Sequence, residues 1–223
     1  MRANTKENLE RMTPEQAYET LAEGNKRFVN NSKKERDLLQ QMSETAGGQH
    51  PFAVVLSCMD SRTSVELIFD QGLGDVFSLR VAGNIVNEDI LGSMEYACGV
   101  VGSKLVVVLG HTRCGAIKGA CDDVKLGNLT GLLEKIRPVI EESGAPGDGD
   151  RSEYVEKVAS ANVLHGINEI LDKSQIIRDL YEKGKIGIVG GIYHVENGQV
   201  DFIKEMFNNK SNLSLSERED QHA

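Results

Sequence analysis

The stretch FAVVLSCMDSR, residues 52–62, decides the fold and the chemistry that we predict for this chain. Its first half is a run of apolar, β-branched residues, which is typical of a strand buried on both faces. Its second half supplies a cysteine, an aspartate and an arginine. A second apolar run, LVVVL at 105–109, is followed by His111-Thr112-Arg113-Cys114. Chemically active side chains therefore follow two predicted strands at the point where each one ends.

Predicted strands and helices alternate around these two runs. Continuous apolar strands separated by helices indicate a mainly parallel sheet that is covered on both faces. Asn197-Gly198 predicts a hairpin turn into an antiparallel edge strand near 200–203. The predicted fold class is α/β, with about four parallel strands plus this edge strand in a central sheet flanked by helices. We expect strands at 52–57, 76–80, 104–109 and 186–193, and helices at about 65–69, 89–101, from Gly115, 129–142 and 153–183 with a break near 172–174.

The N-terminal segment reads as a helical arm. Thr13-Pro14-Glu15-Gln16 is a typical helix start, and a second helix is expected over 36–45 before Gly47-Gly48 ends the arm. The arm has no evident core of its own, so we expect it to pack on another subunit. The predicted division is an arm at 1–48, a zinc-binding α/β catalytic domain at 49–207 and a polar tail at 208–223, with a surface loop at 143–152.

Composition and charge narrow the class of protein. The net charge of −9 argues against a nucleic acid or an anionic membrane surface as partner. The 223 residues contain no apolar run long enough to cross a bilayer, and we find no secretory signal at the start. Four cysteines are too few for a disulfide scaffold, so we expect reduced thiols that are free to bind metal. These features predict a cytoplasmic enzyme.

Cys58, His111 and Cys114 together predict a zinc site. The carboxyl ends of parallel strands meet at one edge of a sheet, where binding sites usually form. Two thiolates and an imidazole supply three ligands and leave the fourth position open, as in catalytic zinc sites. A single cysteine after a strand is usually a small core residue. The combination at successive strand ends favours a metal centre, with one zinc ion per subunit.

Asp60 and Arg62 are the predicted catalytic pair beside this site. Two thiolates neutralise the zinc charge, so hydroxide and the carboxylate of Asp60 can compete for the open position. Arg62 can hold Asp60 through a bidentate pair and keep it off the metal. Asp60 would then orient a zinc-bound water, which ionises near neutral pH to give a hydroxide nucleophile. The alternative is a salt bridge that only shapes the turn, and binding of Asp60 to zinc at low pH stays open.

Four motifs resemble those of the β-class carbonic anhydrases, over about residues 49–119 and more weakly through 186–193. They are Cys-Met-Asp-Ser-Arg (58–62), Arg-Val-Ala-Gly-Asn (80–84), Gly-Ser-Met-Glu-Tyr (92–96) and Gly-His-Thr-Arg-Cys-Gly (110–115). The resemblance implies reversible hydration of carbon dioxide to bicarbonate and a proton. It also implies zinc on Cys58, His111 and Cys114, with Asp60 and Arg62 as the catalytic pair.

The same resemblance implies a substrate pocket. Gln49 matches the glutamine that hydrogen-bonds the substrate, Phe77 and Tyr96 match an aromatic wall, and the backbone N–H of Gly115 would face the substrate. By their positions alone, Phe77 and Tyr96 would be core residues and Gln49 a solvated linker residue. In this family the pocket lies at a dimer interface, which implies a homodimer or a homotetramer.

Two other functions stay open from the sequence. A hydrolase of carbon disulfide or carbonyl sulfide would use the same ligands, and a non-catalytic zinc-binding regulatory protein would not need Asp60 or Arg62. The retention of Gln49, Phe77 and Tyr96 favours carbon dioxide. A proton shuttle cannot be chosen from spacing among His50, His165, His194 and His222.

Overall fold

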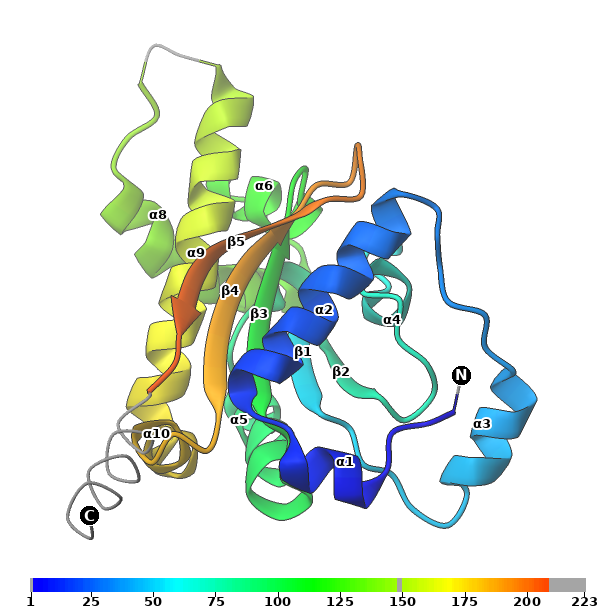
Figure 1. Ribbon diagram of the computed structural model, residues 1–223. Helices are drawn as coiled ribbons and strands as arrows, with labels where there is room; N and C mark the ends of the chain where they lie inside the picture. The colour runs from blue at the N-terminus through cyan, green and yellow to red at the C-terminus, as the bar shows by residue number, and fades with distance from the viewer. Residues whose placement is uncertain (1, 148–149, 209–223) are drawn as a thin grey trace, which may run out of the picture.

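A five-stranded sheet forms the centre of the molecule (Figure 1). The computed structural model describes residues 2–147 and 150–208. The strand order is β2-β1-β3-β4-β5; β2, β1, β3 and β4 run parallel, and β5 is antiparallel to β4. This confirms the predicted fold class. The strands are β1 (Ala53–Ser57), β2 (Val76–Arg80), β3 (Leu105–His111), β4 (Gly187–Tyr193) and β5 (Val200–Met206).

The central strands are buried on both faces, as their sequences predict. Every residue of β1, β3 and β4 is buried. Successive side chains of a strand point to opposite faces, so Val54 and Leu56 lie in one core cluster while Ala53 and Val55 lie in another. The edge strand β5 is mostly exposed and extends to Met206, beyond the predicted end at 203.

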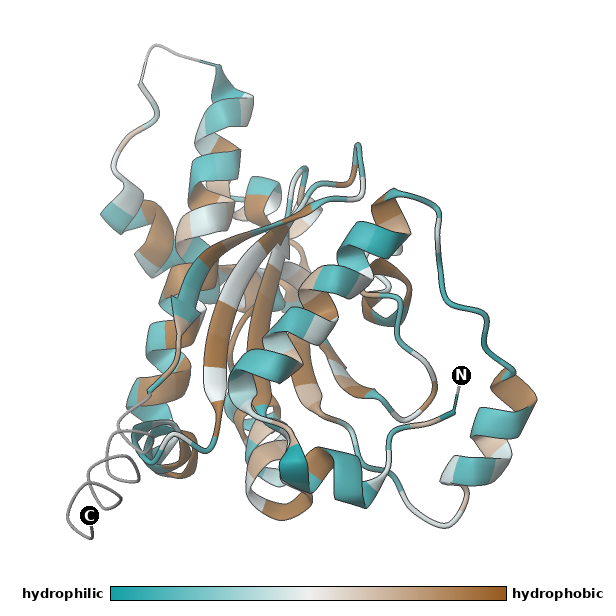
Figure 2. Ribbon diagram, viewed as in Figure 1, coloured by the Kyte–Doolittle hydropathy of each residue, from teal (hydrophilic) through white to brown (hydrophobic). Residues whose placement is uncertain are grey.

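One face of the sheet is covered by α1 (Lys6–Arg11), α2 (Pro14–Val29) and α4 (Val65–Ile68) (Figure 1). The side chain of Thr13 caps α2 in a capping box with Gln16, as predicted. Ala17 and Leu21 of α2 are fully buried against the strands. The short helix α1 was not predicted. Figure 2 shows mostly hydrophilic residues along the visible side of α2, except near its C-terminal end.

The arm therefore packs in large part on its own chain. The helix α3 (Leu38–Thr45) also contacts its own chain, since the buried Gln41 accepts a hydrogen bond from the N–H of Leu73, but its Leu38, Leu39 and Met42 are exposed. That residues 1–48 contact a partner subunit stays a prediction.

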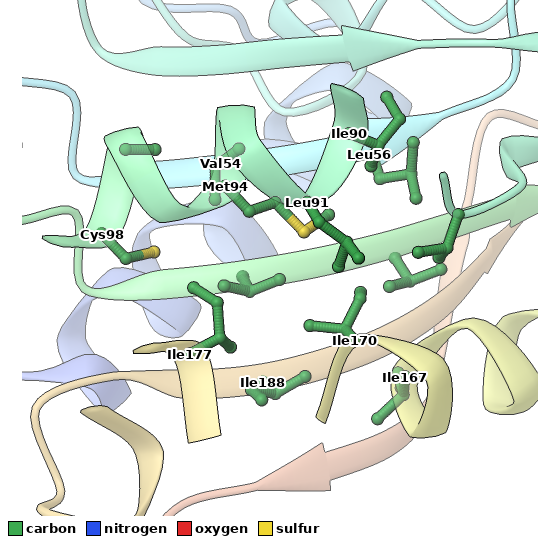
Figure 3. Close-up of a cluster of buried hydrophobic side chains, with 14 of the residues drawn as sticks. Val54, Leu56, Ile90, Leu91, Met94, Cys98, Ile167, Ile170, Ile177 and Ile188 are labelled. Carbon is green, nitrogen blue, oxygen red and sulfur yellow. The ribbon is translucent and has the colours of Figure 1, made fainter. Parts of the chain in front are cut away.

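The opposite face is covered by α5 (Glu88–Glu95), α9 (Arg151–Lys173) and α10 (Gln175–Glu182). Figure 3 shows Met94, Ile170 and Ile177 from these helices among the side chains packed on this face. The single helix predicted over 89–101 is α5 followed by a π-helical segment, Tyr96–Val101. The predicted break near 172–174 is confirmed, because Ser174 has an extended backbone and its hydroxyl caps α10 at Ile177.

A third apolar cluster lies beyond the carboxyl ends of β1 and β3 and includes Cys58 and Cys114. The single helix predicted over 129–142 was wrong. Pro138 lies at the start of the last piece, where its missing N–H interrupts the hydrogen-bond ladder. This region comprises α6 (Gly115–Cys121), α7 (Gly127–Leu133), a 3₁₀ turn (Glu134–Ile136) and α8 (Arg137–Ser143).

Two predictions fall partly or wholly on residues outside the described ranges. The loop at 143–152 includes residues 148–149, and the polar tail consists almost entirely of residues 209–223. Within 2–147 and 150–208, none of the helices combines the length and the apolar character that crossing a membrane requires.

Candidate metal centre and active site

Three side chains that lie at or just beyond the ends of two adjacent strands meet at the carboxyl edge of the sheet. Cys58 directly follows β1, His111 is the last residue of β3, and Cys114 is the N-cap of α6. Strand order reverses at this point, because β2 lies on one side of β1 and β3 on the other. Such a switch point is where sites form in open α/β sheets. All three residues are buried, and their ligand atoms lie within 4.8 Å of one another.

The donor set fits zinc. The Sγ atoms of Cys58 and Cys114 are 3.9 Å apart. Two thiolates bound tetrahedrally at about 2.3 Å from one zinc ion would lie about 3.8 Å apart. His111 Nδ1 lies 2.8 Å from the carbonyl oxygen of Thr112, which can only accept, so Nδ1 carries the proton. His111 Nε2 is then a buried lone pair, and it has no hydrogen-bond partner. Such an orphaned donor atom beside two thiols is suited to a metal.

The electrostatics of the three side chains also favour a cation. The hydrogen bond with Cys114 lowers the pKa of Cys58 to about 4, despite burial. The same bond, together with burial, raises the pKa of Cys114. Burial lowers the pKa of His111, but the negative charge of the nearby Cys58 outweighs burial and raises that pKa. The two thiols thus favour a shared negative charge centred on Cys58, and a divalent ion would displace the protons that remain.

Asp60 and Arg62 form the predicted bidentate pair. Arg62 Nε donates to Asp60 Oδ1 at 2.9 Å, and Arg62 Nη2 donates to Oδ2 at 2.8 Å. The backbone N–H of Arg62 also donates to Oδ1, at 3.0 Å. The side-chain bonds from Arg62 hold the pKa of Asp60 well below its usual range. Asp60 is therefore a carboxylate at any physiological pH, and both its oxygens are held by Arg62.

The turn that carries Cys58 and Asp60 is held by two further side chains. Arg80 Nε donates to the carbonyl oxygen of Cys58 at 3.2 Å, and its Nη2 donates to that of Asp60 at 2.5 Å. The hydroxyl of Thr63 donates to the same two carbonyls, at 2.8 Å and 2.9 Å. Arg80 is not among the site residues predicted from the sequence, although it is the first residue of the motif at 80–84. Arg80 is the last residue of β2 and pairs with Ser57, the residue before Cys58. This position at the carboxyl end of a neighbouring strand would have indicated its role.

Within one chain, three of the four predicted pocket residues lie apart from the predicted metal ligands. Phe77 pairs with Val54 in the amino-terminal half of β1, and its ring packs 6.3 Å from that of Tyr96. Gln49 is exposed and precedes β1, at the opposite end of the strand from Cys58. Of these four residues, Gly115 alone adjoins the ligands, since it follows Cys114 as the exposed first residue of α6.

Comparisons with known proteins agree with this geometry. The profile of the family described as carbonic anhydrase matches residues 53–200. The chain is 36% identical over 194 residues to "Carbonic anhydrase 2" of Mycobacterium tuberculosis, covering 83% of this chain and 91% of the relative. It is 33% identical over 194 residues to a carbonic anhydrase of Mycolicibacterium smegmatis, covering 84% of this chain and 92% of that relative.

Solved structures place the chain in the β-class. One of two tetrameric β-carbonic anhydrases from Sordaria macrospora superposes with a TM-score of 0.67 at 29% identity, covering 73% of this chain and 85% of that one. The β-carbonic anhydrase CafA of Aspergillus fumigatus superposes with a TM-score of 0.66 at 29% identity, covering 78% of this chain and 85% of that one. This chain belongs to the β-class carbonic anhydrase family.

Proposed function

We propose that this protein catalyses the reversible hydration of carbon dioxide to bicarbonate and a proton. One observation carries the proposal: the zinc-type group Cys58, His111 and Cys114 lies beside the ionised pair of Asp60 and Arg62 in a chain of this family. Zinc, when bound, would acidify a water molecule near neutral pH and so supply the nucleophile.

The side chains around the metal centre divide the remaining work. The charges of two thiolates cancel that of the dication, so the centre is neutral and does not hold the bicarbonate product by net charge. Asp60 accepts a hydrogen bond from the attacking water and orients it. Arg62 keeps Asp60 ionised and occupies both its oxygens. The backbone N–H of Gly115, at the first turn of α6, is the group that we assign to the substrate oxygen.

We propose that a second copy of the chain completes the substrate pocket with Gln49, Phe77 and Tyr96. Tyr96 is 52% exposed although its ring packs on Phe77, so one edge of this aromatic pair is free for a partner. The tetrameric state of the Sordaria macrospora relatives supports a homodimer or homotetramer. The exposed residues Leu38, Leu39 and Met42 of α3 support an arm that contacts the partner.

One zinc ion per subunit and a cytoplasmic location complete the proposal. Within 2–147 and 150–208, Cys58, His111 and Cys114 are the one group of this kind. All four cysteines are free, which suits a reducing compartment.

Stopped-flow measurement of carbon dioxide hydration tests the function. The zinc-loaded protein should accelerate hydration far above the buffer rate, and removal of the metal with a chelator should abolish the acceleration. Carbonyl sulfide and carbon disulfide are offered to the same sample. Faster turnover of either one than of carbon dioxide would contradict the proposed substrate, and no turnover of any of them would favour a regulatory protein.

A further inference from the structure

Helix α9 crosses β3 at very close range next to the metal centre. A Cβ atom added to Gly110 would lie 2.7 Å from a methyl carbon of Val163 and 3.6 Å from the carbonyl oxygen of Ala159, both on α9. Only glycine allows this approach of helix to strand. Gly110 immediately precedes His111. The close contact between α9 and β3 therefore lies directly next to a proposed metal ligand.

Asn162 of α9 contacts the backbone that surrounds another ligand. Its Nδ2 donates to the carbonyl oxygen of Gly83 at 2.9 Å, and the bond is buried. The N–H of Gly83 in turn faces Cys58 Sγ, at an N–S distance of 3.4 Å. The two peptide units that flank Gly83 thus join Asn162 on one side to the sulfur of Cys58 on the other.

The backbone of Gly83 could adopt other conformations, which would move its N–H away from the sulfur of Cys58. It has a left-handed backbone with φ of 68°, and a Cβ there would lie 3.0 Å from Ile136 and 3.3 Å from Ala116. Glycine meets both requirements, but it also has more accessible backbone conformations than any other residue. In this conformation the carbonyl of Gly83 accepts from Asn162 while the N–H of Gly83 points at the sulfur of Cys58.

The loop that carries the other two ligands is held by the same helix. Glu156 Oε1 accepts a hydrogen bond from the backbone N–H of Arg113 at 2.8 Å. Arg113 lies between His111 and Cys114 and has φ of 55°, a region that residues other than glycine rarely adopt. Through Asn162 and Glu156, α9 contacts both segments that supply ligands.

We propose that Asn162 is a positioning residue of the metal centre, which acts on Cys58 through the Gly83 peptide. The inference rests on the proposed function, since it requires that Cys58 bind zinc. Hydrogen bonds to ligand sulfur and partners that orient ligands contribute to metal affinity, typically about 10–100-fold for each outer partner. Removal of Asn162 should therefore weaken zinc retention beyond its effect on stability.

Asn25 provides a matched control. Asn25 is 5% exposed and Asn162 is 4% exposed. Asn25 Nδ2 also donates to a glycine carbonyl, that of Gly198, at 2.9 Å. It lies on α2, on the other face of the sheet, away from the metal ligands. Asn25 makes two further buried hydrogen bonds, to the carbonyl of Ile68 and from the N–H of Val200, so its replacement by leucine removes at least as many contacts as that of Asn162. Only the change at Asn162 removes a contact next to the metal centre.

The test compares wild type, Asn162→Leu and Asn25→Leu by the rate of zinc release to an excess of a chromogenic chelator. The sulfur-to-metal charge-transfer absorption of the cobalt-substituted forms and the thermal unfolding of the metal-free forms are measured on the same samples. We expect wild type and Asn25→Leu to release zinc at the same rate. Asn162→Leu should release it about 10–100-fold faster, with a shifted charge-transfer band.

An unchanged release rate and spectrum for Asn162→Leu would overturn the inference, as would equal acceleration in Asn25→Leu. If Asn162→Leu does not fold, Asn162→Asp, which is nearly the same size and lacks the N–H donor, is measured with the same two outcomes. A wild-type protein that holds no zinc would instead contradict the proposed function.

Discussion

The two ends of the central sheet differ in what a single chain supplies. At the carboxyl end, Cys58, His111 and Cys114 lie within 4.8 Å of one another by their ligand atoms, and Asp60 is already paired with Arg62. Toward the amino end, Gln49 is exposed and Tyr96 is half-exposed, with its ring against Phe77. The five residues of β1 separate the ends by about 16 Å at about 3.3 Å per residue.

This difference separates two requirements of the proposed reaction. Metal binding and activation of water depend on residues that one chain brings together. Recognition of the substrate depends, in our proposal, on residues that a second copy must bring to the site. Substitutions at the two ends should therefore fail in different ways, the first by loss of metal or chemistry and the second by loss of substrate turnover with the metal retained.

Replacement of a ligand should have the largest effect. Cys58→Ser substitutes a hydroxyl, which stays protonated and is a poor zinc ligand. We expect loss of bound zinc, measured by elemental analysis, and loss of hydration activity. Cys121→Ser is the control, because Cys121 lies on α6 outside the ligand group. Full activity in Cys58→Ser would remove Cys58 from the metal centre.

Asp60→Asn, at the same end of the sheet, should reduce the hydration rate without loss of zinc. The neutral amide is a weaker acceptor than the carboxylate, and its NH2 group cannot accept from Arg62, so hydration should fall about 10²–10⁴-fold. Zinc content should stay that of wild type. Asp122→Asn, which breaks an exposed ion pair with Lys118, should leave the rate unchanged. Wild-type kinetics in Asp60→Asn would mean that the pair with Arg62 only shapes the turn.

Tyr96→Ala tests whether the other end of the sheet belongs to the active site. We expect zinc content to be unchanged and hydration to fall about 10-fold, as for loss of one apolar pocket contact. Co-assembly with Asp60→Asn sharpens the test. If pockets are shared between subunits, a mixed dimer contains one site with an intact Asp60 from one chain and an intact Tyr96 from the other. Activity above the sum of the two separate variants is expected, and no recovery would contradict a shared pocket.

Asp70→Asn should change stability and leave activity intact. Asp70 is buried, and although burial opposes its charge, hydrogen bonds from Arg27 and Arg36 lower its pKa. A lowered pKa in the folded state stabilises the protein above the ordinary carboxyl pKa of about 3.9, and that contribution is lost as pH falls through the folded value.

The variant should therefore unfold at a lower denaturant concentration than wild type at pH 7. We expect its free energy of unfolding to be lower by about 3–5 kcal/mol, and this difference from wild type should shrink toward pH 3. A stability difference that stays constant over that range would contradict the ion pairing. The ion pairs of Asp70 with Arg27 and Arg36 join the N-terminal arm to the domain, and we expect them not to affect zinc binding. Loss of zinc from this variant would contradict that expectation.

Much of the fold and the metal centre could be predicted from local sequence. The apolar runs at 52–57 and 104–109 predict buried strands because only a doubly covered strand tolerates such continuity. The ligands follow those strands directly, so parallel pairing alone brings Cys58 near His111. The break near Ser174 could also be predicted, whereas the start of a new helix at Pro138 and the π-helical turn at Tyr96 could not be predicted from local sequence.

Contacts between distant segments could not be predicted from one sequence. Asn162 lies in the middle of a long helix, where an asparagine reads as an ordinary solvent-facing residue. Its role depends on the approach of α9 to β3 at Gly110 and on the left-handed turn at Gly83. Gln49, Phe77 and Tyr96 were identified by the family pattern alone, and within one chain they lie apart from Cys58, His111 and Cys114.

X-ray absorption at the zinc edge of the purified wild-type protein tests the metal centre most directly. Two sulfur scatterers at about 2.3 Å and lighter nitrogen or oxygen scatterers at about 2.0 Å are expected for Cys58, Cys114, His111 and one further oxygen ligand. A shell of four sulfurs, a shell without sulfur, or protein that folds fully and holds no zinc would contradict it.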